Sequence, residues 1–126
     1  MVMPFFAMVV YCVGSLLGSS PDTDNIVKMF SAGNSNDISA YFNPSIQLTT
    51  PGKEGVYSKA QAKMILSDFF ENNGPTGAKL KSKGNSDNGA QFVTIDLTTS
   101  SNNYKVNIFY RGTGPKLKIH ELKIEK

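Results

Sequence analysis

The sequence predicts an α+β domain. A strongly bent antiparallel sheet, with short N-terminal strands and a four-stranded C-terminal meander, is expected to wrap around N-terminal helices and one long helix. Two observations predict this fold. Apolar residues in the middle of the chain recur with the spacing i, i+3, i+4, i+7, i+8, which marks one face of an amphipathic helix. These residues are Ala62, Ile65, Leu66, Phe69 and Phe70. After Pro75 the period changes to two residues and remains two to the end, as in consecutive hairpin-linked strands. Helices followed by a run of antiparallel strands are typical of the α+β class.

Residues 1–20 are expected to be a signal peptide, and residues 21–126 a single domain. An apolar stretch ends there in small residues, which is the pattern of a secretory signal. No lysine or arginine precedes that stretch, so a membrane anchor and a buried N-terminal helix stay open as alternatives. The sole cysteine, Cys12, lies in this segment, so the following domain has no thiol for a disulfide or a metal site. The sequence therefore predicts an exported protein, periplasmic or secreted, without a stable membrane anchor.

Three helices are expected in the domain. The first begins at Ser20-Pro21-Asp22, because proline is tolerated in a first helical turn, and it ends at Gly33. The second is short, opens at Ser35-Asn36-Asp37 and carries Ile38, Tyr41 and Phe42 before Pro44 stops it.

The long third helix begins after Ser58. Ser58 and Gln61 have the spacing of a capping box, in which each side chain satisfies a free backbone N–H of the first turn. The segment Asn73-Gly74-Pro75 is expected to end the helix, with a glycine at C′ and a proline that cannot continue it.

Strands are expected over 45–50, briefly at Val56-Tyr57, and four times after Pro75. The last strand is irregular, since Leu117 and Ile119 occupy odd positions while Leu122 and Ile124 occupy even ones. One inserted residue shifts the alternation by one, so we expect a β-bulge near His120-Glu121 that returns all four to one face.

The segment Gly-Lys-Glu-Gly-Val-Tyr-Ser-Lys-Ala-Gln over residues 52–61 is the most specific motif. Together with other short matches it resembles the nuclear transport factor 2-like superfamily, and more narrowly a family of small exported bacterial proteins without an assigned activity. The other matches are Phe30 to Asn34, Tyr41-Phe42, Phe69-Phe70, Lys83-Gly84 and Ile119 to Glu125. The resemblance implies the cone-shaped fold and, as in many relatives, a homodimer formed through the sheet. It implies no particular function.

Two sets of residues are candidates for binding. The first set could line a pocket at the mouth of the cone or serve as ordinary core: Tyr41, Tyr57, Phe69, Tyr104 and Tyr110. The second set forms a loop at the rim: Gly52, Lys53, Glu54 and Gly55. Here the charged pair either binds a ligand or partner, or the glycines shape a turn and Glu54 pairs nearby. We therefore expect a non-enzymatic domain that binds a small apolar ligand or a protein partner. A purely structural domain, its cone filled by its own side chains, remains open.

No catalytic residue, metal ligand or cofactor is predicted. His120 is the only histidine, so neither a nucleophilic triad nor a histidine-rich metal site has local support. Asp96 alternates with Ile95 and Leu97 and is expected to face water. The resemblance leaves an alternative, an isomerase- or dehydratase-like enzyme with an acidic group and a tyrosine in the cone.

Basic residues outnumber acidic ones after Thr76. No aromatic residue alternates with these lysines as a stacking platform for bases would require, so nucleic acid is not the expected partner. Lysines that keep a sheet soluble and prevent edge pairing explain the excess.

Overall fold

A computed structural model describes residues 21–126. The signal peptide predicted over residues 1–20 lies outside the described residues. The described helices are α2 (Pro21–Ala32), α3 (Ser35–Ala40), α4 (Lys59–Asn72) and the short 3₁₀ helix η1 (Gly114–Lys116). Among residues 21–126, no helix has both the length and the apolar character that a membrane span requires.

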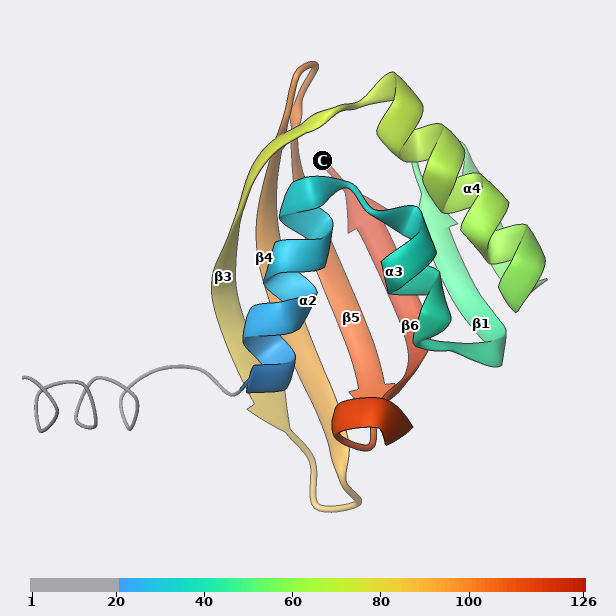
Figure 1. The fold of residues 1–126 in the computed structure, drawn as a ribbon, viewed down its shortest axis with the longest axis vertical. Helices are drawn as coiled ribbons and strands as arrows, with labels where there is room; N and C mark the ends of the chain where they lie inside the picture. The colour runs from blue at the N-terminus through green and yellow to red at the C-terminus, as the bar shows by residue number, and fades with distance from the viewer. Residues whose placement is uncertain (1–20) are drawn as a thin grey trace, which may run out of the picture.

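The six strands form one bent sheet beside these helices (Figure 1). They are β1 (Phe42–Thr50), β2 (Lys53–Ser58), β3 (Pro75–Asn85), β4 (Ala90–Thr99), β5 (Asn103–Arg111) and β6 (Lys118–Glu125). Their spatial order is β2-β1-β6-β5-β4-β3, so the last four strands form the consecutive antiparallel meander that the sequence predicts. The predicted fold class is confirmed.

The pairing of β1 with β6 completes the sheet. It is parallel, with Leu48 opposite Leu122, whereas every other pairing is antiparallel. Nothing in either strand's own alternation specifies this partner, because β1 is separated from β6 by the rest of the domain.

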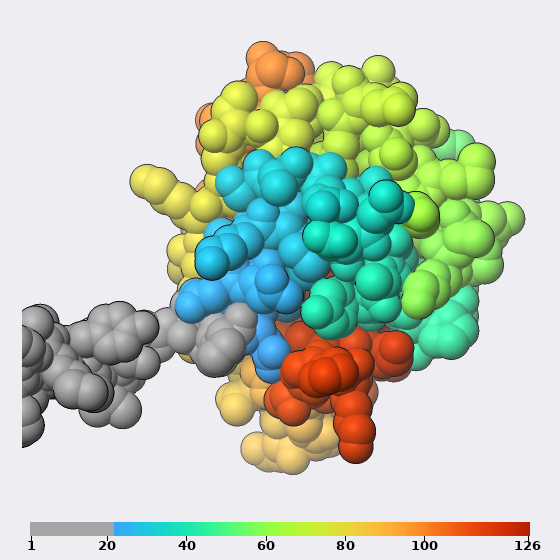
Figure 2. Space-filling view, viewed as in Figure 1, coloured from blue at the N-terminus to red at the C-terminus, as the bar shows by residue number. Residues whose placement is uncertain are grey.

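The helices cover one face of the sheet, as Figure 2 shows from the helical side. Strand residues that point to this face alternate with residues on the other face, which none of the helices in residues 21–126 covers. The covered side chains pack with the apolar stripes of the helices into one core. Its largest fully buried members include Phe30, Phe42, Leu66, Ile108 and Ile119.

The start of α4 agrees with the prediction. The Ser58 hydroxyl accepts a hydrogen bond from the Gln61 backbone N–H at 3.2 Å, and the Gln61 side-chain oxygen accepts one from the Ser58 N–H at 3.2 Å. Both halves of the capping box are present.

Helix α4 ends where the sequence predicts, with Asn73 as its C-cap and Gly74 at C′, but the cap is not made by the glycine. Gly74 does not adopt the left-handed conformation expected of a C′ glycine. Instead, Asn73 caps the helix: its backbone N–H and its side-chain amide both donate to the Phe69 carbonyl, at 2.9 and 3.0 Å. The Asn73 side chain thus helps to satisfy a carbonyl group at the helix end, which is the role of the cap formed around a left-handed glycine in other helices.

The predicted extent of the second helix is wrong. Helix α3 ends at Ala40, Tyr41 is its C-cap, and Phe42 begins β1. The reason is tertiary, because Phe42 pairs with Ile119 and the Tyr41 carbonyl accepts a hydrogen bond from the Ile119 N–H at 2.7 Å. Pro44 is tolerated in β1 because the β1–β6 pairing is irregular between Phe42 and Gln47.

The predicted bulge in β6 is confirmed. Glu121 pairs with Phe109 and Ile119 with Tyr110, which leaves His120 as the inserted residue. As a result Leu117, Ile119, Leu122 and Ile124 are all buried on the helical side, with at most 2% exposed.

A second irregularity, in β3, was not expected. The register shifts between Leu80 and Ser82, so Ser82 pairs with Thr94 on the face opposite Leu80. The alternation over Ala78, Leu80 and Ser82 that the sequence predicts is therefore broken at its end.

Candidate interaction surface

The face of the sheet that the helices leave uncovered carries unusual exposed side chains, and we call it the outer face. Most strands are polar there, as expected for a surface in water. Two large apolar residues depart from this pattern: Phe92 on β4 is 47% exposed, and Val56 on the edge strand β2 is 66% exposed.

Aromatic rings form a row across one end of the outer face. Phe92 and Phe109 are direct cross-strand partners, with ring centroids 5.1 Å apart in an edge-to-face arrangement. The β6 bulge adds the His120 ring, 6.0 Å from Phe109. The guanidinium carbon of Arg111 lies 5.4 Å from the centre of the Phe109 ring, within the range of cation–π contacts. We call these four residues the aromatic row.

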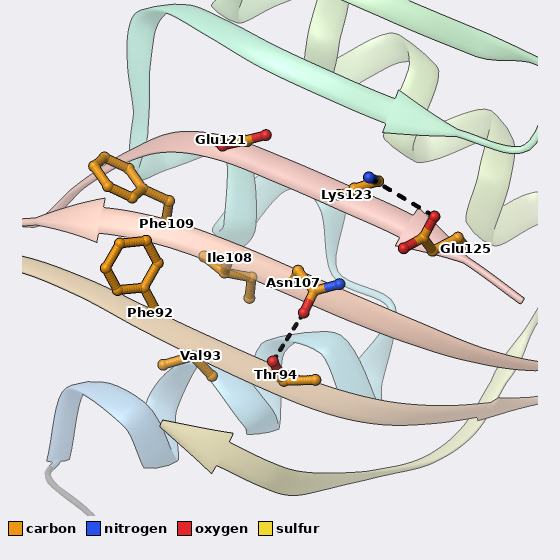
Figure 3. Close-up of a pocket in the computed structure, with 9 residues that line it drawn as sticks. All are labelled: Phe92, Val93, Thr94, Asn107, Ile108, Phe109, Glu121, Lys123 and Glu125. Carbon is orange, nitrogen blue, oxygen red and sulfur yellow. Dashed lines mark hydrogen bonds and ion pairs between the residues drawn. The ribbon is translucent and has the colours of Figure 1, made fainter. Parts of the chain in front are cut away.

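A shallow hollow of about 270 Å³ lies beside the aromatic row (Figure 3). The two phenylalanine rings border it at one end, and Glu121, Lys123 and Glu125 of β6 line one side. Lys123 pairs with Glu125 at 3.9 Å, whereas the Glu121 carboxylate has no ion-pair partner among residues 21–126. The hollow therefore offers an apolar wall and an available negative charge.

The middle of the hollow is polar. The Thr94 hydroxyl donates to the side-chain oxygen of Asn107 at 2.8 Å. The two amide hydrogens of Asn107 take no part in this bond. Figure 3 shows this pair between the two phenylalanine rings and the Lys123–Glu125 pair.

Charged residues form a second row at the opposite end of the outer face. Cross-strand pairing aligns Glu125 on β6, Lys105 on β5, Asp96 on β4 and Lys79 on β3, with alternating signs. All four are exposed, which confirms the expectation that Asp96 faces water. In the described part of the chain, Lys79, Asp96 and Lys105 take part in no ion pair. We call these four residues the charge row.

The helical side of the sheet holds three of the five predicted pocket residues. Phe69 and Tyr104 are buried and pack edge to face with centroids 5.0 Å apart, and the Tyr104 hydroxyl donates to Asn73 at 3.0 Å. Tyr110 is 3% exposed, and its hydroxyl is hydrogen-bonded to the Thr23 side chain.

The remaining two, Tyr41 and Tyr57, are half-buried at the margin of the core. Of the five residues, Phe69 lines a hollow with Lys53 and Asp68, while Tyr104 borders a different hollow with Asp96 and Lys105. The structure thus does not gather the five around either of these hollows.

The pKa of the Tyr110 hydroxyl is perturbed by its surroundings. Burial raises the pKa of its hydroxyl above the ordinary value, the hydrogen bond with Thr23 lowers it, and the nearby negative charge of Asp22 raises it further. Asp22 is itself fixed by accepting a hydrogen bond from the Gly114 N–H at 3.1 Å. This cluster ties the start of α2 to the link between β5 and β6.

The motif loop forms the β1–β2 turn. Gly52 has a φ of +93°, a conformation that L side chains rarely adopt, which explains the glycine. Lys53 lines a rim hollow of about 300 Å³ together with Asp68 and Phe69 of α4. Glu54 is exposed opposite Thr49, and its side chain makes no hydrogen bond or ion pair within residues 21–126.

Chemistry-bearing groups are sparse inside the described domain. The buried polar side chains in residues 21–126 are those of Thr23, Ser39, Thr50 and Thr99, and no carboxylate is among them. Within residues 21–126 no cluster of three histidine, cysteine, aspartate or glutamate residues is arranged to hold a metal ion.

The aromatic row was missed in the sequence, although a signal was present. Phe109 falls in the outward-facing set with Lys105, Asn107 and Arg111, and Phe92 precedes the inward-facing Val93. A phenylalanine on the polar side of an amphipathic strand indicates a surface with a partner. Only the pairing of β4 with β5 places the two rings together.

The architecture defines a class. Residues 21–126 have the nuclear transport factor 2-like fold, a bent, unclosed six-stranded sheet with helices on one face. The family follows from the sequence: the chain belongs to the DUF4783 family, described as a domain of unknown function, whose model matches residues 23–125.

Solved structures agree with this assignment. A DUF4783 protein from Bacteroides ovatus is 27% identical with a TM-score of 0.73, and the match covers 80% of this chain and 91% of that one. One from Bacteroides fragilis is 25% identical with a TM-score of 0.74, covering 86% and 99%. A de novo designed protein with a curved β-sheet, 11% identical with a TM-score of 0.64, covers 82% and 96% and shows the fold alone. No curated protein matches the chain.

Proposed function

We propose that this protein is an exported, non-enzymatic binding domain whose ligand is another protein, bound on the outer face of the sheet. The observation that carries the proposal is the aromatic row. Phe92 and Phe109 lie together on a surface that no described helix covers, beside a hollow with an available carboxylate.

The packing of the core favours a protein ligand over a small apolar molecule held inside the cone. Side chains of the sheet and helices pack together in one cluster, and Phe30, Leu66 and Ile108 are at most 2% exposed. A small apolar ligand there would have to displace close-packed side chains, which is costly.

The aromatic row has the composition of an interface hot spot. Aromatic residues and arginine dominate binding energy at protein interfaces, especially where a rim excludes water. Covering the exposed part of Phe92 would contribute about 2 kcal/mol, taking about 25 cal/mol per Å² of apolar surface. The flanking charged residues on β6 would form the polar rim.

The export part of the proposal rests on the apolar segment that precedes the domain, with its small-residue end. A periplasmic or extracellular domain meets proteins and small molecules rather than nucleic acid. Intact mass measurement of the protein purified from its host tests this part: a chain shortened by the signal segment supports export, and a full-length chain in the cytoplasm contradicts it.

The binding part is tested by cross-linking in intact host cells, followed by affinity isolation and mass spectrometry. Wild type is compared with Phe92→Ser and with Met64→Ser, a matched change at a residue 68% exposed on α4. We expect at least one cross-linked protein, another copy of this chain included, that Phe92→Ser loses and Met64→Ser keeps.

Two results would contradict the proposal. One is a set of cross-linked proteins that does not depend on Phe92, while both variants melt at the same temperature as wild type. The other is a small molecule that remains bound at one per chain in the native mass spectrum of the wild type and both variants.

A further inference from the structure

One row of side chains crosses the outer face from the edge strand β2 to β4, and it narrows the partner. Cross-strand pairing aligns one residue from each of five neighbouring strands: Val56 on β2, Gln47 on β1, Glu121 on β6, Phe109 on β5 and Phe92 on β4. We call these five residues the long row. Its two ends are the exposed apolar residues Val56 and Phe92, and its centre is the Glu121 carboxylate.

Building on the function proposed above, we propose that the partner binds the long row with an extended segment in the polyproline II conformation. Three residues of that segment, at positions i, i+3 and i+6, make the specific contacts. An apolar side chain lies against Phe92, a lysine or arginine pairs with Glu121, and a second apolar side chain covers Val56. The partner is thus another protein that carries a proline-rich segment with one basic residue between two apolar ones.

The charge at the centre of the long row calls for a basic residue. Glu121 is exposed and takes part in no ion pair within residues 21–126. The neighbouring cations are engaged elsewhere, since Lys123 pairs with Glu125 and Arg111 donates to a backbone carbonyl at 3.0 Å. The Phe109 ring is the cross-strand neighbour of Glu121, so the stem of a lysine or the guanidinium of an arginine can pack on the ring while its charge meets the carboxylate.

The spacing of the long row selects the conformation of the segment. Glu121 lies two strands from Val56 and two strands from Phe92. At about 4.8 Å per strand, each interval is about 9.6 Å. A polyproline II helix rises about 3.1 Å per residue with three residues per turn, so every third residue returns to the same side after about 9.3 Å. Its residues i, i+3 and i+6 therefore match the two ends and the centre of the row.

Other regular conformations fit less well. In a β-strand, residues on one side recur after about 6.7 Å, which does not match an interval of about 9.6 Å. An α-helix returns to the same side after seven residues, about 10.5 Å. However, an α-helix is a straight rod, whereas the sheet bends around its own helices (Figure 1). A polyproline II segment has no internal hydrogen bonds that hold it straight, so it can follow the bend.

The remaining member of the long row can bind the backbone of such a segment. Polyproline II leaves every carbonyl without an internal hydrogen bond. Gln47 lies between Val56 and Glu121, and its side-chain amide makes no hydrogen bond within residues 21–126. An amide group can donate to a carbonyl that passes over it. Prolines in the segment also reduce the entropy lost on binding, because they hold the chain in this conformation beforehand.

The experiment is fluorescence anisotropy with the protein purified from its host and a labelled synthetic peptide, Leu-Pro-Pro-Arg-Pro-Pro-Leu. The pattern of this peptide reads the same in both directions, so it fits the row whichever way the segment runs. Wild type is expected to bind it saturably at protein concentrations up to millimolar. Replacing the peptide arginine by glutamate, or shortening the peptide to Leu-Pro-Arg-Pro-Leu, should weaken binding roughly tenfold or more, because the first change reverses the charge and the second breaks the spacing.

Protein variants test the two ends and the centre separately. Val56→Ser and Phe92→Ser should each bind the arginine peptide roughly fivefold more weakly or worse, whereas Met64→Ser, at an exposed residue of α4, should bind like wild type. Glu121→Lys should lose the arginine peptide and bind the glutamate peptide instead. Glu71→Lys, the same charge change on exposed α4, should keep the wild-type preference. Thermal melts establish that each variant is folded, and the altered peptides test the inference without any change to the protein.

Three results would overturn the inference. They are wild type that binds no peptide at millimolar concentration, equal binding of the arginine and glutamate peptides, and binding that Val56→Ser leaves unchanged. The cross-linking experiment in intact cells then separates the two proposals. A cross-linked protein that still depends on Phe92, a second copy of this chain included, leaves the proposed function standing and removes only the polyproline II partner. Absence of both the peptide binding and any Phe92-dependent cross-link contradicts both.

Discussion

The substitution Gly112→Ala tests how tightly the β5–β6 link is packed. Gly112 has a φ of +84°, and a Cβ built on it would lie 2.5 Å from the Lys116 carbonyl oxygen and 3.3 Å from the Leu117 Cα. Both are backbone atoms, so no rotamer change relieves the overlap. The backbone must move, and it carries Leu117, which is 2% exposed in the core.

Gly89 provides a matched control. Its φ is +85°, but a Cβ there would meet nothing within 4 Å. Alanine at positive φ costs about 1–2 kcal/mol at either position. Only Gly112→Ala adds the cost of forcing atoms into a filled space, about 1–3 kcal/mol. The gain from a stiffer unfolded chain applies to both and cancels in the comparison.

Urea unfolding followed by circular dichroism measures the difference. We expect Gly112→Ala to lower the free energy of unfolding by about 2–5 kcal/mol and Gly89→Ala by about 1–2 kcal/mol. Equal losses in the two variants would refute the reasoning, since the crowding around Lys116 would then cost nothing.

Two further predictions concern buried tyrosines. Asn73→Ala removes both the acceptor of the Tyr104 hydroxyl and the side-chain amide that caps α4, and it should lower the free energy of unfolding by about 1–3 kcal/mol in urea titrations. Asn72→Ala, at an exposed position of the same helix end, should cost less than about 1 kcal/mol. Similar losses in the two variants would argue against a contribution from the Asn73 side-chain hydrogen bonds. Because the raised pKa of Tyr110 lets the unfolded chain ionise first, stability should fall as pH rises above about 10. In Tyr110→Phe, urea titrations from about pH 9 to about pH 11 should show a shallower fall, after a loss of about 1 kcal/mol at neutral pH from the missing bond with Thr23. An unchanged slope would contradict this.

Local sequence patterns were sufficient to predict the structure wherever contacts between residues close in the chain determine it. The capping box at Ser58 and Gln61, the stripe of the long helix and the hairpins of the meander all depend on contacts within a few residues. The bulge at His120 was also predictable, because burial forces four apolar residues onto one face and the odd-to-even shift records where an extra residue enters.

The sequence alone does not distinguish a pocket from a core at the five aromatic positions, for a physical reason. Aromatic residues at regular spacing read equally as a pocket or as core, and the choice depends on which other side chains fill the same space. In the structure, Phe69 and Tyr104 pack against each other, so ring contacts occupy that part of the cone.

The sequence by itself determined the class of fold, the order of its elements and the alternation that divides each strand into two faces. Only the tertiary structure decided the parallel pairing of β1 with β6, the early end of α3 and the meeting of Phe92 with Phe109. The reason is that strand pairing joins residues far apart in the chain. Each strand's alternation specifies which side chains face outward, but the neighbours they meet depend on the register of the whole sheet.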